Sequence, residues 1–370
     1  MSAELDMPRG ASKGRTTLLV LLALTGVGVW LVCALWTDPP RAMRALLVNF
    51  AYFTPMGAGM VVWSAVVLLS RGRWARQAEP TTLSGVAQAP LSLAILLVLA
   101  LTAPLWASWL HAKDLHQGVW LAPWFVFLRD GVALLLLWVL AGIYVHLRRR
   151  GKRPLHLAGW MTFAYCCVIS LLGFDLIMAL DPHWYSSLFG GYYFISGLYT
   201  AVAAWTLATV LGGRASTNVL QDLGKLIVAF SLLTTYLMYS QLMPIWYENL
   251  PHEVRFILPR YSISNWRYVS VVLLAVIYLG PLAYLLTRWA KRTRLTLGVA
   301  SGLVLAGMWV ERWWLIVPTN HRGTADVPPL TLGWPELSLA VGLGALFVFL
   351  LGQTRRRLEE AMPEEGGSHA

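Results

Sequence analysis

Charged side chains occur inside several long apolar runs of this sequence. Three separate runs contain them, and the residues are Arg129, Asp130, Asp175, Asp181, Glu311 and Arg312. Ionisable groups in apolar surroundings are costly, so they mark candidate functional positions. A carboxylate there can accept a proton, and an arginine can hold a neighbouring carboxylate ionised or polarise a ligand oxygen. The chemistry that we expect is a proton relay or the binding of a polar head group such as that of a quinone.

Aromatic and polar side chains add to this set. In the apolar run 222–246, helical spacing places Tyr236 and Tyr239 on one face, and Gln241 follows within one turn. His183 directly follows another apolar run, where a histidine either caps the membrane surface or exchanges a proton with a site below it. We therefore include these four side chains among the candidates for the relay or the quinone-head pocket.

A purely structural explanation is open for the same residues. Opposite charges on neighbouring helices can neutralise each other, for example Arg129 with Asp175. Arg312 could pair with Asp130 in the same way. Such pairs would fix helix packing without taking part in any reaction.

Asp222 and Lys225 form a different kind of pair. They lie three residues apart at the start of an apolar run, on one helical face. They are candidates for taking up protons from the cytoplasm, but pairing at a helix end and snorkelling to the membrane surface explain such residues more often.

The elements that carry these residues are expected to be membrane-spanning helices. Hydrophobic residues make up 57% of the 370 residues and charged residues only 13%, against about 25% charged in soluble proteins. A lipid-exposed segment must satisfy its backbone internally, so we predict an all-α polytopic membrane protein. Runs long enough to cross the bilayer occur at 16–36, 45–70, 90–110, 119–146, 158–181, 189–211, 222–246, 267–289, 295–317 and 336–353.

The distribution of Lys and Arg predicts the orientation of these spans. Eighteen of them lie in the tails and the even-numbered loops, and six lie in the odd-numbered loops. The excess places both termini in the cytoplasm, with tails at 1–15 and 354–370 around a transmembrane domain at 16–353. We interpret the net charge of +11 as charge at the membrane edge, so the lipid bilayer is the expected partner and nucleic acid is not.

The sequence contains no motif for a bound cofactor. Its three cysteines, Cys33, Cys166 and Cys167, lie in apolar runs and form no CxxC or CxxCH. No histidine lies at membrane depth to ligate haem, and no GxxxxGK[ST] is present. We therefore expect no metal site and no covalently attached cofactor, and any redox role would depend on metal centres in other subunits.

Two stretches resemble a known family. Residues 174–193 read FDLIMALDPHWYSSLFGGYY, and 222–251 begins with DLGKLIVAF and ends with YSQLMPIWYENLP. They look like the smaller NrfD-type, polysulfide-reductase-like membrane subunit (ActF-type) of bacterial alternative complex III, a quinol:cytochrome c oxidoreductase. The resemblance covers nearly the whole chain.

The resemblance implies a fold and a setting. It implies two four-helix bundles with flanking helices, in the bacterial inner membrane, beside a larger NrfD-like homologue. An iron–sulfur subunit and multihaem cytochrome c subunits would lie on the external side and carry the iron–sulfur clusters and haem c. Quinol or quinone is the ligand that it implies, and the chain itself would contribute proton conduction and assembly without being catalytic alone.

Two other functions use the same residues. A proton- or anion-coupled secondary transporter would use the buried charges to bind its solute, although such sites tend to lie at the membrane midplane on interrupted helices. A non-catalytic anchor would use them only for packing.

Overall fold

The computed structural model describes most of the chain. It describes residues 9–111, 118–213, 215–254, 256–261, 265–319, 330 and 332–362, and the side chains of 9–13, 251 and 252 are outside this description. Parts of both predicted tails and most of the connection 318–335 therefore lie outside the described residues. The last helix continues to Ala361, so part of the predicted tail 354–370 is helical, which corrects that boundary.

Ten helical segments in the described part of the chain are long and apolar enough to cross a membrane. This confirms the predicted all-α fold, and no strand occurs among the described residues. The helices are α1 (Arg9–Val32), α2 (Pro39–Leu69), α3 (Glu79–Leu83), α4 (Ala89–Leu101), α5 (Ala103–Trp106), α6 (Pro123–Arg149), α7 (Leu155–Leu176), α8 (Phe189–Gly212), α9 (Thr217–Glu248), α10 (Pro251–Val254), α11 (Leu258–Tyr261), α12 (Trp266–Leu273), α13 (Gly280–Leu285), α14 (Arg288–Arg292), α15 (Arg294–Ile316) and α16 (Trp334–Ala361).

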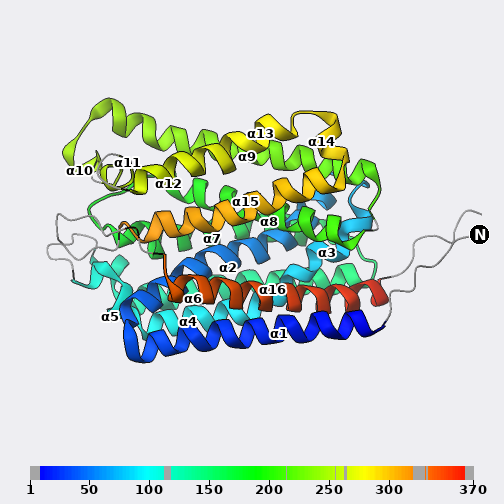
Figure 1. Cartoon of the computed structure of the whole chain (residues 1–370), viewed down its shortest axis with the longest axis horizontal. Coiled ribbons are helices and arrows are strands. Elements are labelled where there is room, and N and C mark those ends of the chain that lie inside the picture. Colours follow the sequence, from blue (N-terminus) through cyan, green and yellow to red (C-terminus); the bar gives the residue numbers. More distant parts are fainter. Residues whose placement is uncertain are drawn as a thin grey trace, which may run out of the picture.

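The spans form two four-helix bundles with two flanking helices (Figure 1). In the first bundle α2, α4, α6 and α7 contact one another, and in the second α8 and α9 pack with α15 and the α12–α13 span. Helix α2 also packs against α8 and α15, which joins the bundles, and it is the most buried span. Helices α1 and α16 lie side by side at the edge of the first bundle (Figure 1). The expected two-bundle arrangement is therefore confirmed.

The third span differs from its predicted limits. The hydropathy pattern predicts 90–110, whereas the span begins at Arg76 and α4 ends at Leu101. Pro104 explains the end of the helix, because proline has no N–H for the carbonyl one turn earlier and its ring clashes with that carbonyl. The remaining residues of the predicted span form the short helix α5 and a single 3₁₀ turn.

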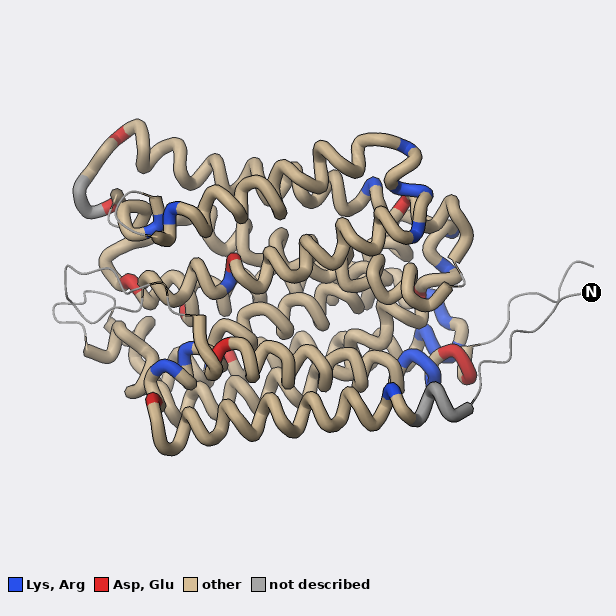
Figure 2. Tube along the Cα trace, in the orientation of Figure 1, with Lys and Arg blue, Asp and Glu red and all other residues tan. Residues whose placement is uncertain are grey.

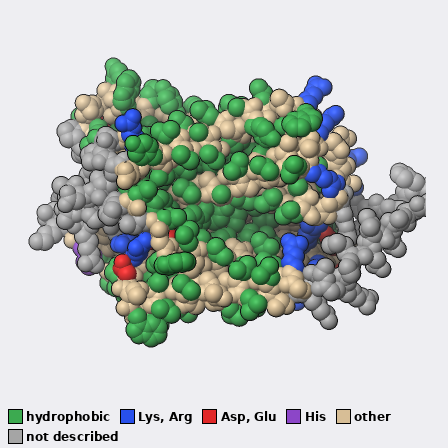
Figure 3. All heavy atoms as spheres, viewed as in Figure 1, with side chains coloured by type: hydrophobic (Ala, Val, Ile, Leu, Met, Phe, Trp, Pro, Cys, Tyr) green, Lys and Arg blue, Asp and Glu red, His purple; other side chains and the backbone are tan. Residues whose placement is uncertain are grey.

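Charged residues gather at the two ends of the helices. We call the end where α1 begins the proximal end and the opposite one the distal end (Figure 1). Lys and Arg are densest at the proximal end, and the middle of the bundle carries few charges (Figure 2). Apolar side chains cover most of the middle of the face seen in Figure 3. This pattern is that of a multi-pass membrane protein with apolar flanks and polar ends.

Glycines allow the first and last spans to approach closely. A Cβ atom added at Gly26 of α1 would lie 2.7 Å from the Cα of Gly342 in α16, and one at Gly342 would lie 2.9 Å from the backbone nitrogen of Val27. Small residues at such a crossing permit backbone contact between membrane helices. Gly28, on the same helix, has no neighbour within 4 Å of a built Cβ.

We expect Gly26→Ala to lower the thermal stability of the protein in detergent. The added methyl group must push α1 away from the α16 backbone, and overpacking of this kind costs about 1–3 kcal/mol. Gly28→Ala is the matched control, and its added methyl group meets open space, so it should leave the unfolding midpoint unchanged or slightly raised. Equal effects of the two substitutions would show that the crossing is not tight.

Candidate functional site: two buried ionic clusters

The first cluster joins α6 and α7 and consists of Arg129, Asp130 and Asp175; we call it the aspartate cluster. The Arg129 Nη2 atom lies 2.5 Å from Asp175 Oδ2, and its Nε atom lies 3.6 Å from Asp130 Oδ1. Both aspartates are fully buried, and the guanidinium also lies over the Trp120 ring, 3.9 Å from its centroid. Arg129 follows the first residue of α6 by six positions, so the cluster lies roughly 9 Å inside the distal end of that helix.

The aspartate cluster contains more negative than positive charge. One guanidinium faces two carboxylates, and Asp130 and Asp175 repel each other electrostatically. Both oxygens of Asp130 and the Oδ1 atom of Asp175 have no hydrogen-bond donor in the structure. A buried group of this kind is stabilised by one more positive charge, either a proton or a small cation that carboxylate oxygens can ligate.

The second cluster joins α8 and α15 and is centred on Glu311 and Arg312; we call it the glutamate cluster. Arg312 donates from Nη1 to Glu311 Oε2 at 2.7 Å and from Nη2 to the Ser196 hydroxyl at 2.6 Å. The Tyr192 hydroxyl donates to the other oxygen of the Glu311 carboxylate. Both members of the ion pair are at most 1% exposed, so their charges balance within the protein, although the Arg312 Nε atom has no hydrogen-bond acceptor.

A chain of hydroxyl groups leads away from Glu311. The hydroxyls of Tyr192 and Tyr278 are 2.9 Å apart, and Tyr278 must be the donor because Tyr192 donates to the carboxylate. Tyr278 also lines a cavity of about 110 Å³ between α9 and α12, together with Tyr239 and Trp314. That volume is large enough for water molecules. A proton can therefore pass between the cavity and Glu311 along two phenols.

Tyr278 lies in an interruption of its span. Residues Leu274–Leu279 form a π-helical segment between α12 and α13. Pro281 explains it, because proline cannot donate to the Ile277 carbonyl four residues earlier. The Ile277 carbonyl accepts instead from the Tyr199 hydroxyl at 2.9 Å, and the Tyr278 carbonyl accepts from Ser231 at 2.6 Å. Interruptions of this type recur at functional sites in membrane helices.

Tyr193 of α8 packs against residues of both α15 and α7. The Tyr193 ring lies under the Arg312 guanidinium, 4.7 Å from the centroid to Cζ. A Cβ built at Gly173 of α7 would lie 2.7 Å from the same ring, and Gly173 precedes Asp175 by two residues. Tyr193 thus contacts Arg312 of the glutamate cluster and also Gly173 of α7, the helix that carries Asp175.

The sequence-based pairings are partly present. Arg129 pairs with Asp175 as expected, whereas Arg312 pairs with Glu311 and not with Asp130. The reason is that Glu311 is fully buried beside Arg312 on α15, while Asp130 lies on α6 next to Arg129.

Other candidates lie outside both clusters. Tyr236 and Tyr239 are 64% and 62% exposed on the outer surface of α9, and Gln241 is buried but donates to its own helix at Leu237. The buried phenols near the charges are those of Tyr192, Tyr193 and Tyr278, which the sequence analysis did not select. A tyrosine inside an apolar run is a sequence signal for a buried phenol. The spacing of residues does not show, however, toward which neighbouring helix the phenol points.

The remaining candidates lie at the ends of the bundle. Asp181 is buried after α7 and acts electrostatically on Arg260, whose pKa is lowered by burial to about 9, so Arg260 is still charged at neutral pH. His183 is exposed. Asp222 and Lys225 form an ion pair of 2.7 Å near the start of α9, with the lysine side chain 56% exposed.

Two further ion pairs were not anticipated from the sequence. Arg41 at the start of α2 binds Glu336 of α16 through both carboxylate oxygens at 2.7 and 3.0 Å. At the proximal end, Arg148 of α6 forms the same kind of bidentate ion pair with Glu79 of α3. Each joins residues from separate helices, and such partners are not apparent from local pattern.

These features define a multi-pass membrane protein with charged sites held between its helices. No protein-family model matches the chain. It is 23% identical over 351 residues, which are 93% of this chain, to the probable potassium transport system protein Kup 2 of Albidiferax ferrireducens. The chain spans about half the length of this curated relative, since the match covers 54% of it.

This relative contradicts the function expected from the resemblance. Its name describes potassium transport and not electron transport, so the expectation of a quinol:cytochrome c oxidoreductase subunit engaged in electron transport is wrong, and the transporter alternative is favoured. The buried charges could not decide between the two, because both classes place ionisable groups at membrane depth. The resemblance to the ActF-type family, and the quinone and redox partners that it implies, stay predictions.

We expect Arg312→Gln to destabilise the protein strongly. The substitution leaves the buried Glu311 carboxylate without its cationic partner, and breaking a buried pair costs about 3–5 kcal/mol. Thermal unfolding in detergent measures this effect. The double variant with Glu311→Gln should recover much of the loss, because it leaves no unpaired charge.

Lys225→Gln is the control for this experiment. It removes one member of an exposed pair and should change stability by less than about 1 kcal/mol. A similar loss for Lys225→Gln and Arg312→Gln would mean that the glutamate cluster is not the buried, paired unit described above.

Proposed function

We propose that this chain is a secondary transporter for a small monovalent cation, with potassium as the first candidate. The observation that carries the proposal is the aspartate cluster, in which two buried carboxylates share one arginine. A monovalent cation is the smallest ligand that would neutralise this group. The Asp130 oxygens and Asp175 Oδ1, which have no hydrogen-bond donor, are suitable ligands for K⁺.

The curated relative supports potassium as the substrate. Its name describes a potassium transport system, and its match runs along 93% of this chain. Ten membrane-spanning helices and an interrupted span are also what a secondary transporter requires.

We propose that transport is coupled to protons through the glutamate cluster. Glu311 is the buried carboxylate, and Tyr192 and Tyr278 connect it to the cavity beside α9. Protonation of Glu311 would release its contacts with Arg312 and Tyr192, which bind the ionised form. Tyr278 lies in the π-helical segment, so this change would reach the interrupted part of its span.

We place the protein in the bacterial inner membrane with its proximal end in the cytoplasm. The excess of Lys and Arg in the tails and even-numbered loops supports this orientation. In that orientation both clusters lie nearer the external side, where a transporter would admit its cation.

We expect vesicles that contain the purified full chain to take up Rb⁺, a tracer for K⁺, and Asp175→Asn to slow this uptake at least tenfold. The substitution removes the surplus negative charge that attracts the cation while it keeps the size of the side chain. Initial rates of Rb⁺ uptake, with protein content and folding checked for each variant, give the comparison.

Asp38→Asn is the matched control, since Asp38 caps α2 at its start and asparagine caps a helix equally well. Its rate should equal that of the unchanged protein. Failure of the folded wild-type chain to carry Rb⁺ or K⁺ under any gradient would overturn the proposed substrate.

We further expect Glu311→Gln to abolish the acceleration of Rb⁺ uptake by an inward proton gradient. Glutamine cannot gain or lose a proton, so coupling should be lost, whereas exchange of Rb⁺ at equilibrium should continue. The substitution also leaves Arg312 without its anionic partner, so rates are compared per amount of folded protein. Uptake measured with and without the gradient separates the two effects. Full stimulation in Glu311→Gln vesicles would exclude this residue as the proton carrier.

A further inference from the structure

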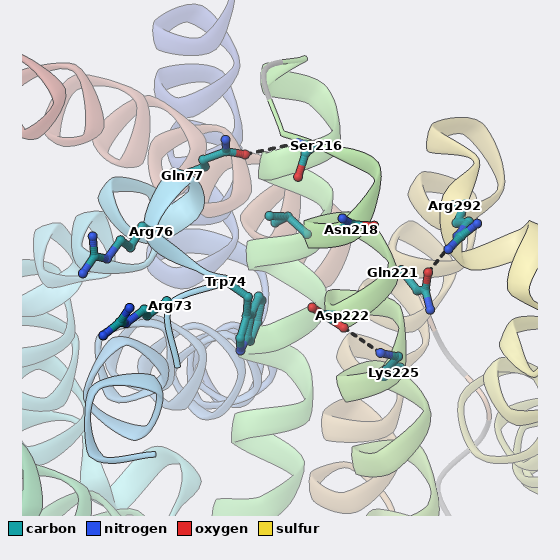
Figure 4. A pocket seen from close by; sticks show the side chains of 11 residues that line it. Arg73, Trp74, Arg76, Gln77, Ser216, Asn218, Gln221, Asp222, Lys225 and Arg292 are labelled. Carbon is teal, nitrogen blue, oxygen red and sulfur yellow. Dashed lines mark hydrogen bonds and ion pairs between the residues drawn. The ribbon is translucent and has the colours of Figure 1, made fainter. Parts of the chain in front are cut away.

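A large polar cavity lies at the proximal end of the second bundle. Its volume is about 770 Å³, and its walls come from the segment 73–77, the first turns of α9 and the end of α14. Figure 4 shows Arg73 and Arg76 on one side and Lys225 and Arg292 on the other. Three segments that are distant in the sequence therefore meet around one space.

Positive charge dominates this cavity. Its lining contains four basic side chains and one carboxylate, that of Asp222. Lys225 pairs with Asp222 at 2.7 Å, whereas Arg292 donates from Nε to the neutral Gln221 Oε1 atom at 2.7 Å. The charge of Arg292 is thus not balanced by that contact. The cavity has a formal charge of +3.

The lining also offers neutral hydrogen-bonding groups. Gln77, Ser216 and Asn218 face the same space, and Gln77 Oε1 accepts from the Ser216 backbone N–H at 3.3 Å. Trp74 forms one wall, and its ring is fixed by stacking on Trp205 with centroids 5.6 Å apart. Amides and a hydroxyl beside arginines are the groups that commonly bind phosphate oxygens.

We infer that this cavity binds a phosphate-bearing ligand. A phosphate-bearing ligand carries the negative charge and the oxygen acceptors that basic side chains match, and Arg73 and Arg292 line two separate sides of the cavity. The cavity is larger than one phosphate ion needs and lies within the usual range of ligand pockets, so the ligand includes more than the phosphate.

Two sources can supply this chemistry at a membrane edge. One is the phosphate of an anionic lipid, because basic pockets between helices bind such head groups. The other is a soluble phosphate compound, such as a nucleotide, for which Trp74 would provide an aromatic wall. The inference concerns binding of this ligand alone, so its test does not depend on which ion the protein transports.

The test uses the full chain in nanodiscs of phosphatidylcholine. Calorimetric titration with ATP and with inorganic phosphate detects a soluble ligand, and native mass spectrometry after exposure to phosphatidylglycerol detects a retained lipid. The variant is Arg73→Gln with Arg292→Gln. The control is Arg149→Gln with Arg150→Gln, since these exposed arginines lie at the same end but outside the cavity.

Binding to the unchanged protein should weaken at least tenfold in the cavity variant and not in the control. ATP or phosphate binding with this pattern identifies a soluble ligand, and selective loss of phosphatidylglycerol identifies a lipid. Either result supports the site. Absence of both kinds of binding, or equal weakening in the control, would overturn it.

Discussion

A charge in the apolar interior of a membrane protein must be balanced by a group from a neighbouring helix, and this constraint organises the bundle. Arg129 and Asp175 tie α6 to α7, and Arg312 ties α15 to α8 through Ser196. The glutamate cluster is closed, because each of its charges has a partner. The aspartate cluster has an unbalanced negative charge, because two carboxylates share one arginine. That imbalance is the feature on which the proposed cation site rests.

The backbone obeys the same constraint at the interrupted span. Pro281 removes a donor, and the carbonyl that loses it is satisfied by a hydroxyl from α8. Gly307 of α15 lets that helix pack directly against Ile277, since any Cβ there would collide with the isoleucine side chain. The interruption is therefore held by side chains from α8 and α9 and by the close approach of α15. Because Tyr278 lies within it, the geometry of the span is connected to the state of Glu311.

Sequence reasoning predicted the number of spans and the depth of the buried charges, because length, hydropathy and helical rise determine both. It found the pairing of Arg129 with Asp175. It missed Tyr192 and Tyr278, since the spacing of residues gives the face of a helix but not the neighbour that the face meets. Tyr239 shows the same limit. The prediction that it shares a helical face with Tyr236 was correct, yet that face is largely exposed. Function was the least predictable part, since buried acids serve several classes of membrane protein.

The close contact of α1 with α16 has a consequence for biogenesis. These are the first and last of the ten spans described above, and Gly26 meets Gly342 at their crossing. During synthesis α1 is inserted early, but the surface that it needs does not exist until α16 leaves the ribosome. The first helix must therefore wait in the lipid or beside an insertion factor, with its glycine face uncovered. Synthesis of α16 is thus the event that closes this edge of the bundle.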